Sequence, residues 1–196
     1  MATADHYDLD ATLLDARTQY FERNGFGADG GYSAKTVTVE VAGIKLRIPN
    51  TPGRVHAVRY HDLHHIMTGY TTHMSGESEI GAWELASNCR DLYAAWVLNG
   101  AAFAFGLISC PRRVRAAFIR GCHTRNLYDR DFNDILLNRR VGELRAELGL
   151  ERDSLEQPLA ATIGDRLAFV GAAVICLGVP LAVLCGVIFG VLVLLR

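Results

Sequence analysis

The chain has 196 residues, of which 50% are hydrophobic, and its 20 basic and 21 acidic side chains give a formal net charge of −1. This length allows one domain of ordinary size with a hydrophobic core, and the composition excludes intrinsic disorder. The near-neutral charge is atypical of nucleic-acid-binding proteins, so no nucleic-acid partner is expected.

Residues 1–53 are expected to form an N-terminal section with one helix and one β-hairpin. Apolar residues recur at helical spacing over Asp8–Arg23, and Asn24–Gly25 follows as a stop signal. The glycine-rich segment 25–31 lacks the preceding strand and following helix that a phosphate-binding loop requires, so we interpret it as a linker. Strict alternation of apolar residues over Thr36–Ile48 predicts a two-stranded hairpin.

Residues 54–151, which also carry the histidine-rich segment His61–His65, are expected to form a helical metal-binding domain, since their apolar residues recur at helical spacing and clustered histidines are candidate metal ligands. The predicted helices cover Arg54–Thr68, Met74–Ser87, Asp91–Ile108, a segment that begins at Ser109–Pro111, and a segment that contains Gly142–Leu148. Residues 152–166 are expected to be a linker. The predicted fold class is mainly α: a helical bundle with a small N-terminal β-hairpin and a C-terminal transmembrane helix.

The last segment, residues 167–195, contains no Asp, Glu, Lys or Arg over 29 residues, and it accounts for a mean hydropathy of +0.14, which is high for a soluble protein. As a helix it would extend about 44 Å, which exceeds the ~30 Å hydrocarbon layer and would be accommodated by tilt or by a kink at Pro180. We interpret it as a single transmembrane anchor, since a buried core helix is usually much shorter. Gly186 and Gly190 have the spacing of a helix-packing motif, so a homodimer is one expectation.

The N-terminal residues indicate on which side of the membrane the soluble domain lies. Residues 1–15 contain four acidic residues, no basic residue and no apolar run, so no secretory signal peptide is predicted. The five cysteines form no CxxC pair, which favours free thiols in a reducing compartment. The soluble domain is therefore expected on the cytoplasmic side, held at the membrane by its single-pass C-terminal anchor.

Three of the seven histidines lie within five residues, at His61, His64 and His65. On a helix, His61 and His65 project from one face at a spacing that suits chelation of a divalent metal. Asp62 lies on the neighbouring face, where it would act as a ligand, as an orienting partner or as a base. Glu77 follows on the next predicted helix, and two imidazoles with one or two carboxylates suit zinc or another divalent cation.

Other interpretations of this histidine segment stay open. It would have no binding role if it were only a solvated helix face. Zincins carry Glu where this chain has Asp62, and HD phosphohydrolases need a further upstream histidine, for which His56 lies too close, and a downstream aspartate. The segment His61–His65 also matches the HxxHH box of membrane desaturases, but those enzymes need several such boxes and several membrane spans.

The segment from His61 to Glu77 matches the pattern HDxxH-x11-E, and through it the chain resembles a helical family of ubiquinone (coenzyme Q) biosynthesis. The resemblance covers residues 54–151, about half of the chain. Further matching positions are Gly69, Thr72, Met74, Gly76, Trp83, Glu84, Asn126–Tyr128 and Glu143–Leu150. The departures are Thr71, where a proline is common, the additional His64, the N-terminal hairpin and the C-terminal anchor.

The resemblance implies an all-helical protein that binds a divalent metal, zinc, and a polyprenylated aromatic substrate at the membrane surface. It implies a metal-dependent decarboxylase (a lyase) that removes the C1 carboxylate of a polyprenyl hydroxybenzoate, with hydroxylation at that carbon, and that organises other quinone-biosynthesis proteins. Its metal ligands would be His61, His65 and Glu77. Asp62 would be a fourth ligand or a base. Glu84 follows Glu77 on the same helical face and would contact the metal ligands rather than the metal. Asp62 and Glu84 are the candidate catalytic residues.

Two alternatives to a decarboxylase remain. One is a non-catalytic scaffold that binds a prenyl lipid and partner enzymes and uses the metal structurally. The other is an unrelated metallohydrolase.

Two weaker signals lie in the later helices. The basic run Arg112–Arg125 would contact anionic headgroups or a substrate phosphate, or it would form an exposed helix face. Tyr93, Trp96, Phe103 and Phe105 in the predicted third helix would line a tunnel for a prenyl chain or belong to the core.

Overall fold

The computed structural model describes residues 5–41, 44–151 and 159–194, without the side chains of residues 39–41, 44, 46, 180 and 182–194. The described part is mainly helical with a small two-stranded antiparallel hairpin near the N-terminus, which confirms that much of the predicted fold class. The elements in chain order are α1 (Leu13–Asn24), β1 (Thr36–Val41), β2 (Ile44–Pro49), α2 (Pro52–Thr68), α3 (Met74–Ser87), α4 (Tyr93–Ser109), α5 (Pro111–His123), α6 (Asp134–Leu137), α7 (Val141–Leu148) and α8 (Ile163–Leu194).

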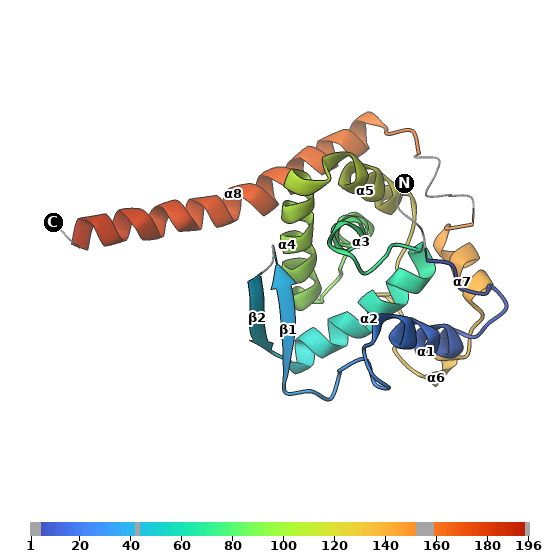
Figure 1. The fold of residues 1–196 in the computed structure, drawn as a ribbon. Coiled ribbons are helices and arrows are strands. Elements are labelled where there is room, and N and C mark those ends of the chain that lie inside the picture. Colours follow the sequence, from blue (N-terminus) through green and yellow to red (C-terminus); the bar gives the residue numbers. More distant parts are fainter. Residues whose placement is uncertain (1–4, 42–43, 152–158, 195–196) are drawn as a thin grey trace.

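Helix α3 lies at the centre of the molecule, where it packs against α4 and α5 (Figure 1). Helix α2 contacts α3 and α4, and α1 packs on α2 at the edge of the molecule that also carries α6 and α7. The hairpin immediately precedes α2 in the chain, and α8 passes α4 and α5 before it projects away from the body (Figure 1). The central helices α2 and α3 carry the predicted metal ligands.

The ends of α2 and α3 follow local capping signals. The Thr51 side chain accepts a hydrogen bond from a backbone N–H of the first turn of α2, and Pro52 occupies the start of the helix. Gly69 ends α2 with a φ of 80°, a left-handed conformation that favours glycine. Helix α3 has the predicted bounds, Met74–Ser87.

Helices α1 and α6 differ most clearly from the prediction. Helix α1 begins at Leu13 rather than at Asp8, because the Thr12 side chain accepts a hydrogen bond from the backbone N–H of Asp15 and so caps the helix there. The short helix α6, Asp134–Leu137, was not predicted, since one turn shows no helical periodicity.

One hydrophobic core joins α1 to the central helices. Tyr20 and Phe21 of α1 belong to the same buried cluster as Leu63 of α2 and Trp83 of α3. Helices α3 and α5 approach so closely at Gly121 that a Cβ atom there would lie 2.4 Å from the Trp83 carbonyl oxygen. Packing on several sides therefore fixes α2 and α3, and with them the side chains of the candidate site.

Helix α8 begins shortly before the predicted anchor, inside the segment predicted as a linker. Thr162 donates its backbone N–H to the Asp165 carboxylate over 2.8 Å, and Asp165 donates its backbone N–H to the Thr162 hydroxyl over 3.1 Å, so the two residues cap the helix. The first turns of α8 pack on α4 and α5. Their partly buried residues are Phe169, Ala172, Ala173 and Cys176.

Across the described ranges, we find no helix with both the length and the apolar character that crossing a membrane requires. Much of the predicted anchor, residues 167–195, has side chains outside the described residues, Gly186 and Gly190 among them. Residues 152–158 of the predicted linker lie outside them as well. The anchor and the homodimer stay predictions.

Candidate metal centre

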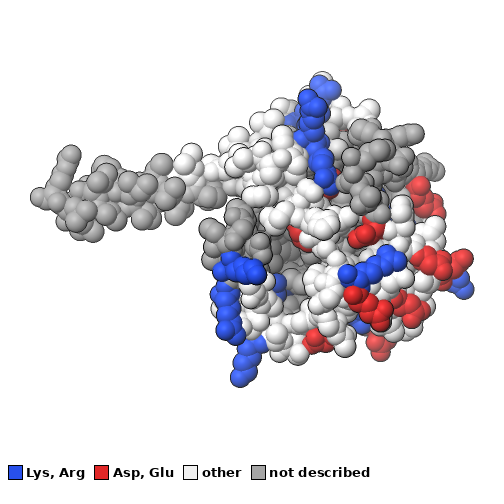
Figure 2. Space-filling view, viewed as in Figure 1, with Lys and Arg blue, Asp and Glu red and all other residues white. Residues whose placement is uncertain are grey.

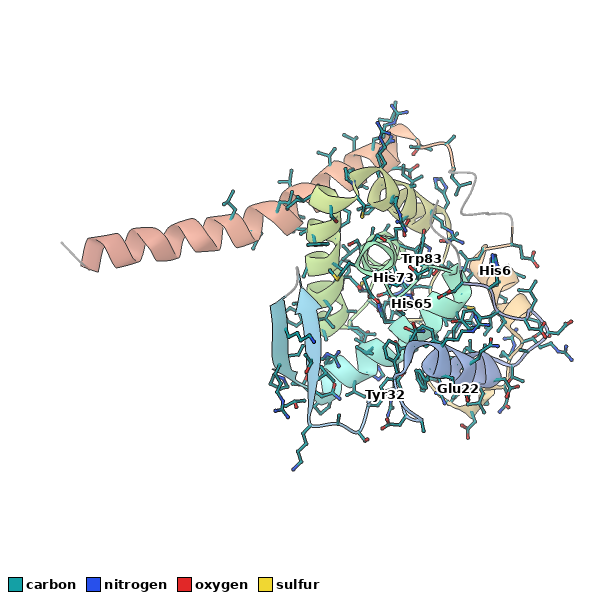
Figure 3. All side chains as sticks on the ribbon, viewed as in Figure 1. His6, Glu22, Tyr32, His65, His73 and Trp83 are labelled. Carbon is teal, nitrogen blue, oxygen red and sulfur yellow. The ribbon has the colours of Figure 1, made fainter. Side chains whose placement is uncertain are left out.

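Three of the predicted ligands meet where α2 and α3 face each other. His61 and His65 lie one turn apart on α2, and Glu77 lies in the first turn of α3. Their ligand atoms lie within 4.8 Å of one another. Figure 3 shows His65 in the interior between these helices, whereas His6 lies at the periphery. The structure therefore brings together a group that could hold a metal ion.

The other nitrogen of each imidazole is already occupied. His65 donates its Nδ1–H to the carbonyl oxygen of Tyr70 over 2.8 Å, because a carbonyl can only accept. His61 donates its Nδ1–H to Glu84 Oε1 over 3.0 Å. In the neutral imidazoles, both Nε2 atoms therefore carry lone pairs, and both face the centre of the group.

The distances between the ligand atoms fit a metal ion of zinc size. The Nε2 atoms of His61 and His65 lie 3.2 Å apart, and Glu77 oxygens lie 3.1 Å from the first and 3.4 Å from the second. Metal–ligand bonds of about 2.0–2.1 Å in tetrahedral geometry place neighbouring ligand atoms about 3.3 Å apart. A divalent ion could thus be held by small adjustments of three side chains.

The Glu84 carboxylate binds His61 at Nδ1, on the side of the ring opposite the ligand atom Nε2. It is fully buried, and its Oε1 atom accepts hydrogen bonds from His61 and from Nδ1 of His64, the latter over 2.7 Å. Its Oε2 atom accepts from Asn99 of α4 and from the hydroxyl of Tyr128. A carboxylate that orients a metal-binding imidazole is a common arrangement around metal sites, and it raises the basicity of the ligand nitrogen.

His64 is the additional histidine in the motif, and it is completely buried. It donates Nδ1–H to Glu84, and its Nε2 atom accepts the backbone N–H of Leu127 over 2.9 Å. Burial lowers the pKa of His64, and Glu84 opposes that effect only in part. His64 therefore links the metal centre to the segment after α5 as a neutral imidazole.

The two glutamates are held in their ionised form. Burial acts to raise the pKa of Glu77, but the contacts with His65 and His61 outweigh it and lower the pKa to about 2. Burial acts the same way on Glu84, and its contacts with His61 and His64 again outweigh it and hold its pKa below the ordinary value. For His61, burial acts to lower the pKa, whereas Glu84 and Glu77 raise it well above the ordinary value. The surroundings thus stabilise a positive charge at the centre, either a proton or a metal ion.

The centre is open on one side. The side chain of His65 is only 1% exposed, whereas the side chains of His61 and Glu77 are 19% and 33% exposed. A ligand would therefore approach beside Glu77 and His61. Catalytic zinc sites have three protein ligands and an open position, whereas structural sites are closed by four.

The group that could hold a metal ion does not include Asp62, so its predicted role as a fourth ligand or a base stays a prediction. Adjacent residues of a helix project about 100° apart, so Asp62 leaves the helix in a different direction from His61. It accepts hydrogen bonds from Tyr32 over 2.6 Å and from Tyr20 over 3.3 Å. Burial raises the pKa of Asp62, and the Tyr32 hydrogen bond opposes this. The Tyr20 ring stacks on His65 at a centroid distance of 5.5 Å, so Tyr20 links Asp62 to a residue of the centre.

Glu84 lies on the same side of α3 as Glu77, as the sequence spacing predicted. Its carboxylate binds His61 and His64 and does not reach the open side of the centre. Sequence reasoning missed Asn99, although a single amide in the otherwise apolar helix α4 is a signal that a buried polar partner exists. Tyr128 lies in a segment that the family resemblance had marked, without a role.

The basic run and the aromatic residues of the third predicted helix each contain residues that bind or pack within the protein and residues that are exposed. Arg113 of the basic run donates to Glu79 over 2.9 Å, and Arg120 donates to the Thr68 carbonyl, so both bind within the protein. Phe103 packs with other aromatic rings in the core, whereas Tyr93 is 80% exposed.

Comparisons of the chain with protein-family models, with curated proteins and with solved structures find no match. The resemblance to the ubiquinone-biosynthesis family therefore rests on the motif residues alone.

Proposed function

We propose that this protein is a metal-dependent decarboxylase of ubiquinone biosynthesis that acts on a polyprenyl hydroxybenzoate at a membrane. The observation that carries the proposal is a centre of three protein ligands, His61, His65 and Glu77, with an open side. The match of these residues to the HDxxH-x11-E pattern supports the substrate class. Zinc is the proposed metal, because two imidazoles and a carboxylate are ligands that it commonly takes.

A divalent ion held by these ligands would supply a Lewis acid for the carboxylate or phenolic oxygen of the substrate. In the decarboxylation, the bond between the ring carbon and the carboxyl carbon breaks, its electron pair stays on the ring, carbon dioxide leaves, and the ring carbon takes a proton. The residues of the chain fix the geometry for this step. Glu84 holds His61, and the Tyr70 carbonyl and the Tyr20 ring hold His65. The partly exposed Glu77 marks the side on which substrate enters.

The charge-free segment at the C-terminus supports the proposed membrane anchor. The length of residues 167–195 exceeds a bilayer, but α8 packs on the body as far as Cys176. The roughly 19 helical residues from Cys176 to Leu194 extend about 28 Å, which fits the ~30 Å hydrocarbon layer without tilt or kink. A cytoplasmic domain on such an anchor would meet a substrate whose prenyl tail lies in the bilayer.

Turnover tests the proposal directly. The full chain is reconstituted in lipid nanodiscs, loaded with zinc, and given a short-chain prenyl hydroxybenzoate labelled in its carboxyl carbon. We expect release of labelled carbon dioxide that depends on the metal. Release should be lost in Glu77→Gln, and it should persist in His73→Ala, which changes an exposed histidine outside the ligand group.

Other outcomes would overturn the decarboxylase. Binding of metal and prenyl lipid without turnover would assign the chain as a scaffold. Cleavage of phosphate esters or peptides by the zinc-loaded chain would assign a metallohydrolase.

A further inference from the structure

Helix α4 has two apolar faces but packs through only one. No charged residue occurs between Tyr93 and Ser109. One stripe is buried against the neighbouring helices, and it consists of Ala95, Asn99, Phe103 and Gly106. The opposite stripe is exposed and consists of Tyr93, Val97, Ala101 and Ile108. Tyr93 and Ile108, near its two ends, are 80% and 79% exposed. A helix that is apolar all round is normally covered on all sides.

The exposed stripe continues onto α8. The two helices touch at Gly100, where an added Cβ atom would lie 3.6 Å from the Cys176 sulfur. The exposed side chains of α8 on either side of this contact are again apolar, namely Val174, Ile175, Leu177, Val179 and Leu181. Figure 2 shows no Lys, Arg, Asp or Glu where the described part of α8 leaves the body.

We infer that the exposed stripe of α4 lies in the interfacial layer of the lipid bilayer that α8 enters. This inference rests on the proposed membrane anchor. If α8 crosses the hydrocarbon layer from Cys176 onward, its contact with Gly100 places the middle of α4 at the membrane surface. Figure 1 shows α4 running across the direction of α8, so α4 lies along the membrane plane.

The residues at the ends of α4 suit this position. Tyr93 and Trp96 combine an apolar ring with a polar group, as residues at membrane interfaces do. The Trp96 indole N–H donates to the Arg90 carbonyl over 2.9 Å, and the residue is 41% exposed. Exposed arginines, Arg90 and Arg112, lie just beyond the two ends of the helix, where they can reach lipid phosphates.

This placement puts the metal centre close to the lipid headgroups. Asn99, on the buried stripe of α4, donates to Glu84, which holds His61. Only the thickness of one helix, about 10 Å, separates the centre from the exposed stripe. A substrate with a lipid tail and a polar ring could therefore keep its tail in the bilayer while its ring reaches the centre.

Tryptophan quenching by brominated lipids tests the inference on the full chain in nanodiscs. The chain has two tryptophans, of which Trp83 is fully buried and Trp96 is partly exposed. With bromine near the headgroup end of the acyl chains, we expect strong quenching of the Trp96 emission. The Trp96→Phe variant, which retains only the Trp83 emission, should lose most of this quenching. Equal quenching of the two proteins would overturn the inference.

Charged substitutions supply a matched pair of variants. Val97→Asp on the exposed stripe should reduce the quenching of Trp96 at least severalfold, whereas Ile135→Asp, at an exposed apolar residue of α6, should leave it unchanged. Quenching that persists in Val97→Asp would contradict the inference.

Two further measurements separate this inference from the proposals on which it rests. Extraction of the full chain from membranes by alkaline carbonate would overturn the anchor, and with it the inference. The chain could resist extraction and yet form a cross-linked dimer in which Trp96 is not quenched. This result would overturn the inference, because a second copy of the chain would then cover the exposed stripe. Carbon dioxide release is scored independently, so a failure of decarboxylation alone leaves the quenching result intact.

Discussion

The Nε2 atoms of His61 and His65 face each other at 3.2 Å while each ring donates its Nδ1 proton outward, to Glu84 and to Tyr70. Two lone pairs at this distance repel each other unless a positive charge lies between them. The nearby Glu77 carboxylate makes a positive charge still more favourable. A divalent metal ion satisfies all three groups at once, and this relationship is the basis of the functional proposal.

Replacing Glu84 by Gln should weaken metal binding although Glu84 touches no metal. The amide group cannot accept hydrogen bonds at both atoms, so at least one donor among His61, His64 and Asn99 would lose its partner. We expect an affinity about 10–100-fold lower in competition with a chromophoric chelator. Glu79→Gln is the matched control, because Glu79 lies on the same helix but binds Arg113, and its affinity should equal that of the wild type.

Replacing His64 by Ala should destabilise the fold. The variant leaves the Leu127 N–H and one Glu84 contact without a partner and opens a cavity in the core. We expect a loss of about 2–5 kcal/mol, which lowers the Tm by about 5–15 °C. Thermal unfolding monitored by tryptophan fluorescence measures it, with the exposed His73→Ala as the control. An unchanged Tm in His64→Ala would show that the buried network contributes nothing to stability.

The sequence predicted those parts of the fold and the site that depend on local spacing. The bounds of α3 and the end of α2 at Gly69 follow from capping residues and helical periodicity, and both agree with the structure. The pairing of His61 with His65 follows from the four-residue spacing, and Glu77 from its place just after the turn.

The remaining features depend on contacts between distant segments. Asp62 adjoins His61 in the sequence, but the helix turns it towards Tyr32, a residue of the loop before the hairpin. The partners of Glu84 come from three elements, and no spacing rule brings Asn99 or Tyr128 to it. Only the packing of α2, α3 and α4 around one core determines these contacts.

Metal affinity should rise with pH. In the metal-free protein, burial acts to lower the pKa of His61, but Glu84 and Glu77 raise it well above the ordinary value, so the metal must displace a proton near neutrality. Glu77, with a pKa of about 2, is ionised throughout this range and adds no further dependence. We expect the affinity to increase about tenfold per pH unit between about pH 6 and about pH 8. A chelator competition series would show a flat profile if His61 did not bind the metal.

The contact between α3 and α5 should tolerate no side chain at Gly121. A Cβ atom there would lie 2.4 Å from the Trp83 carbonyl oxygen, so Gly121→Ala requires the two helices to move apart. We expect a loss of about 1–3 kcal/mol in the free energy of unfolding. Gly53→Ala is the control, because nothing lies within 4 Å of its added Cβ atom. Its stability should be unchanged or higher by up to about 1 kcal/mol. Equal stability of both variants would contradict the close packing.

X-ray absorption at the zinc edge of the zinc-loaded full chain tests the central claim, that His61, His65 and Glu77 form a metal centre. The account predicts one zinc ion per chain, nitrogen and oxygen neighbours at about 2.0–2.1 Å with the signature of two imidazoles, and loss of the bound zinc in His65→Ala but not in His73→Ala. A sulfur shell at about 2.3 Å, or stoichiometric zinc with two imidazoles still bound in His65→Ala, would contradict it.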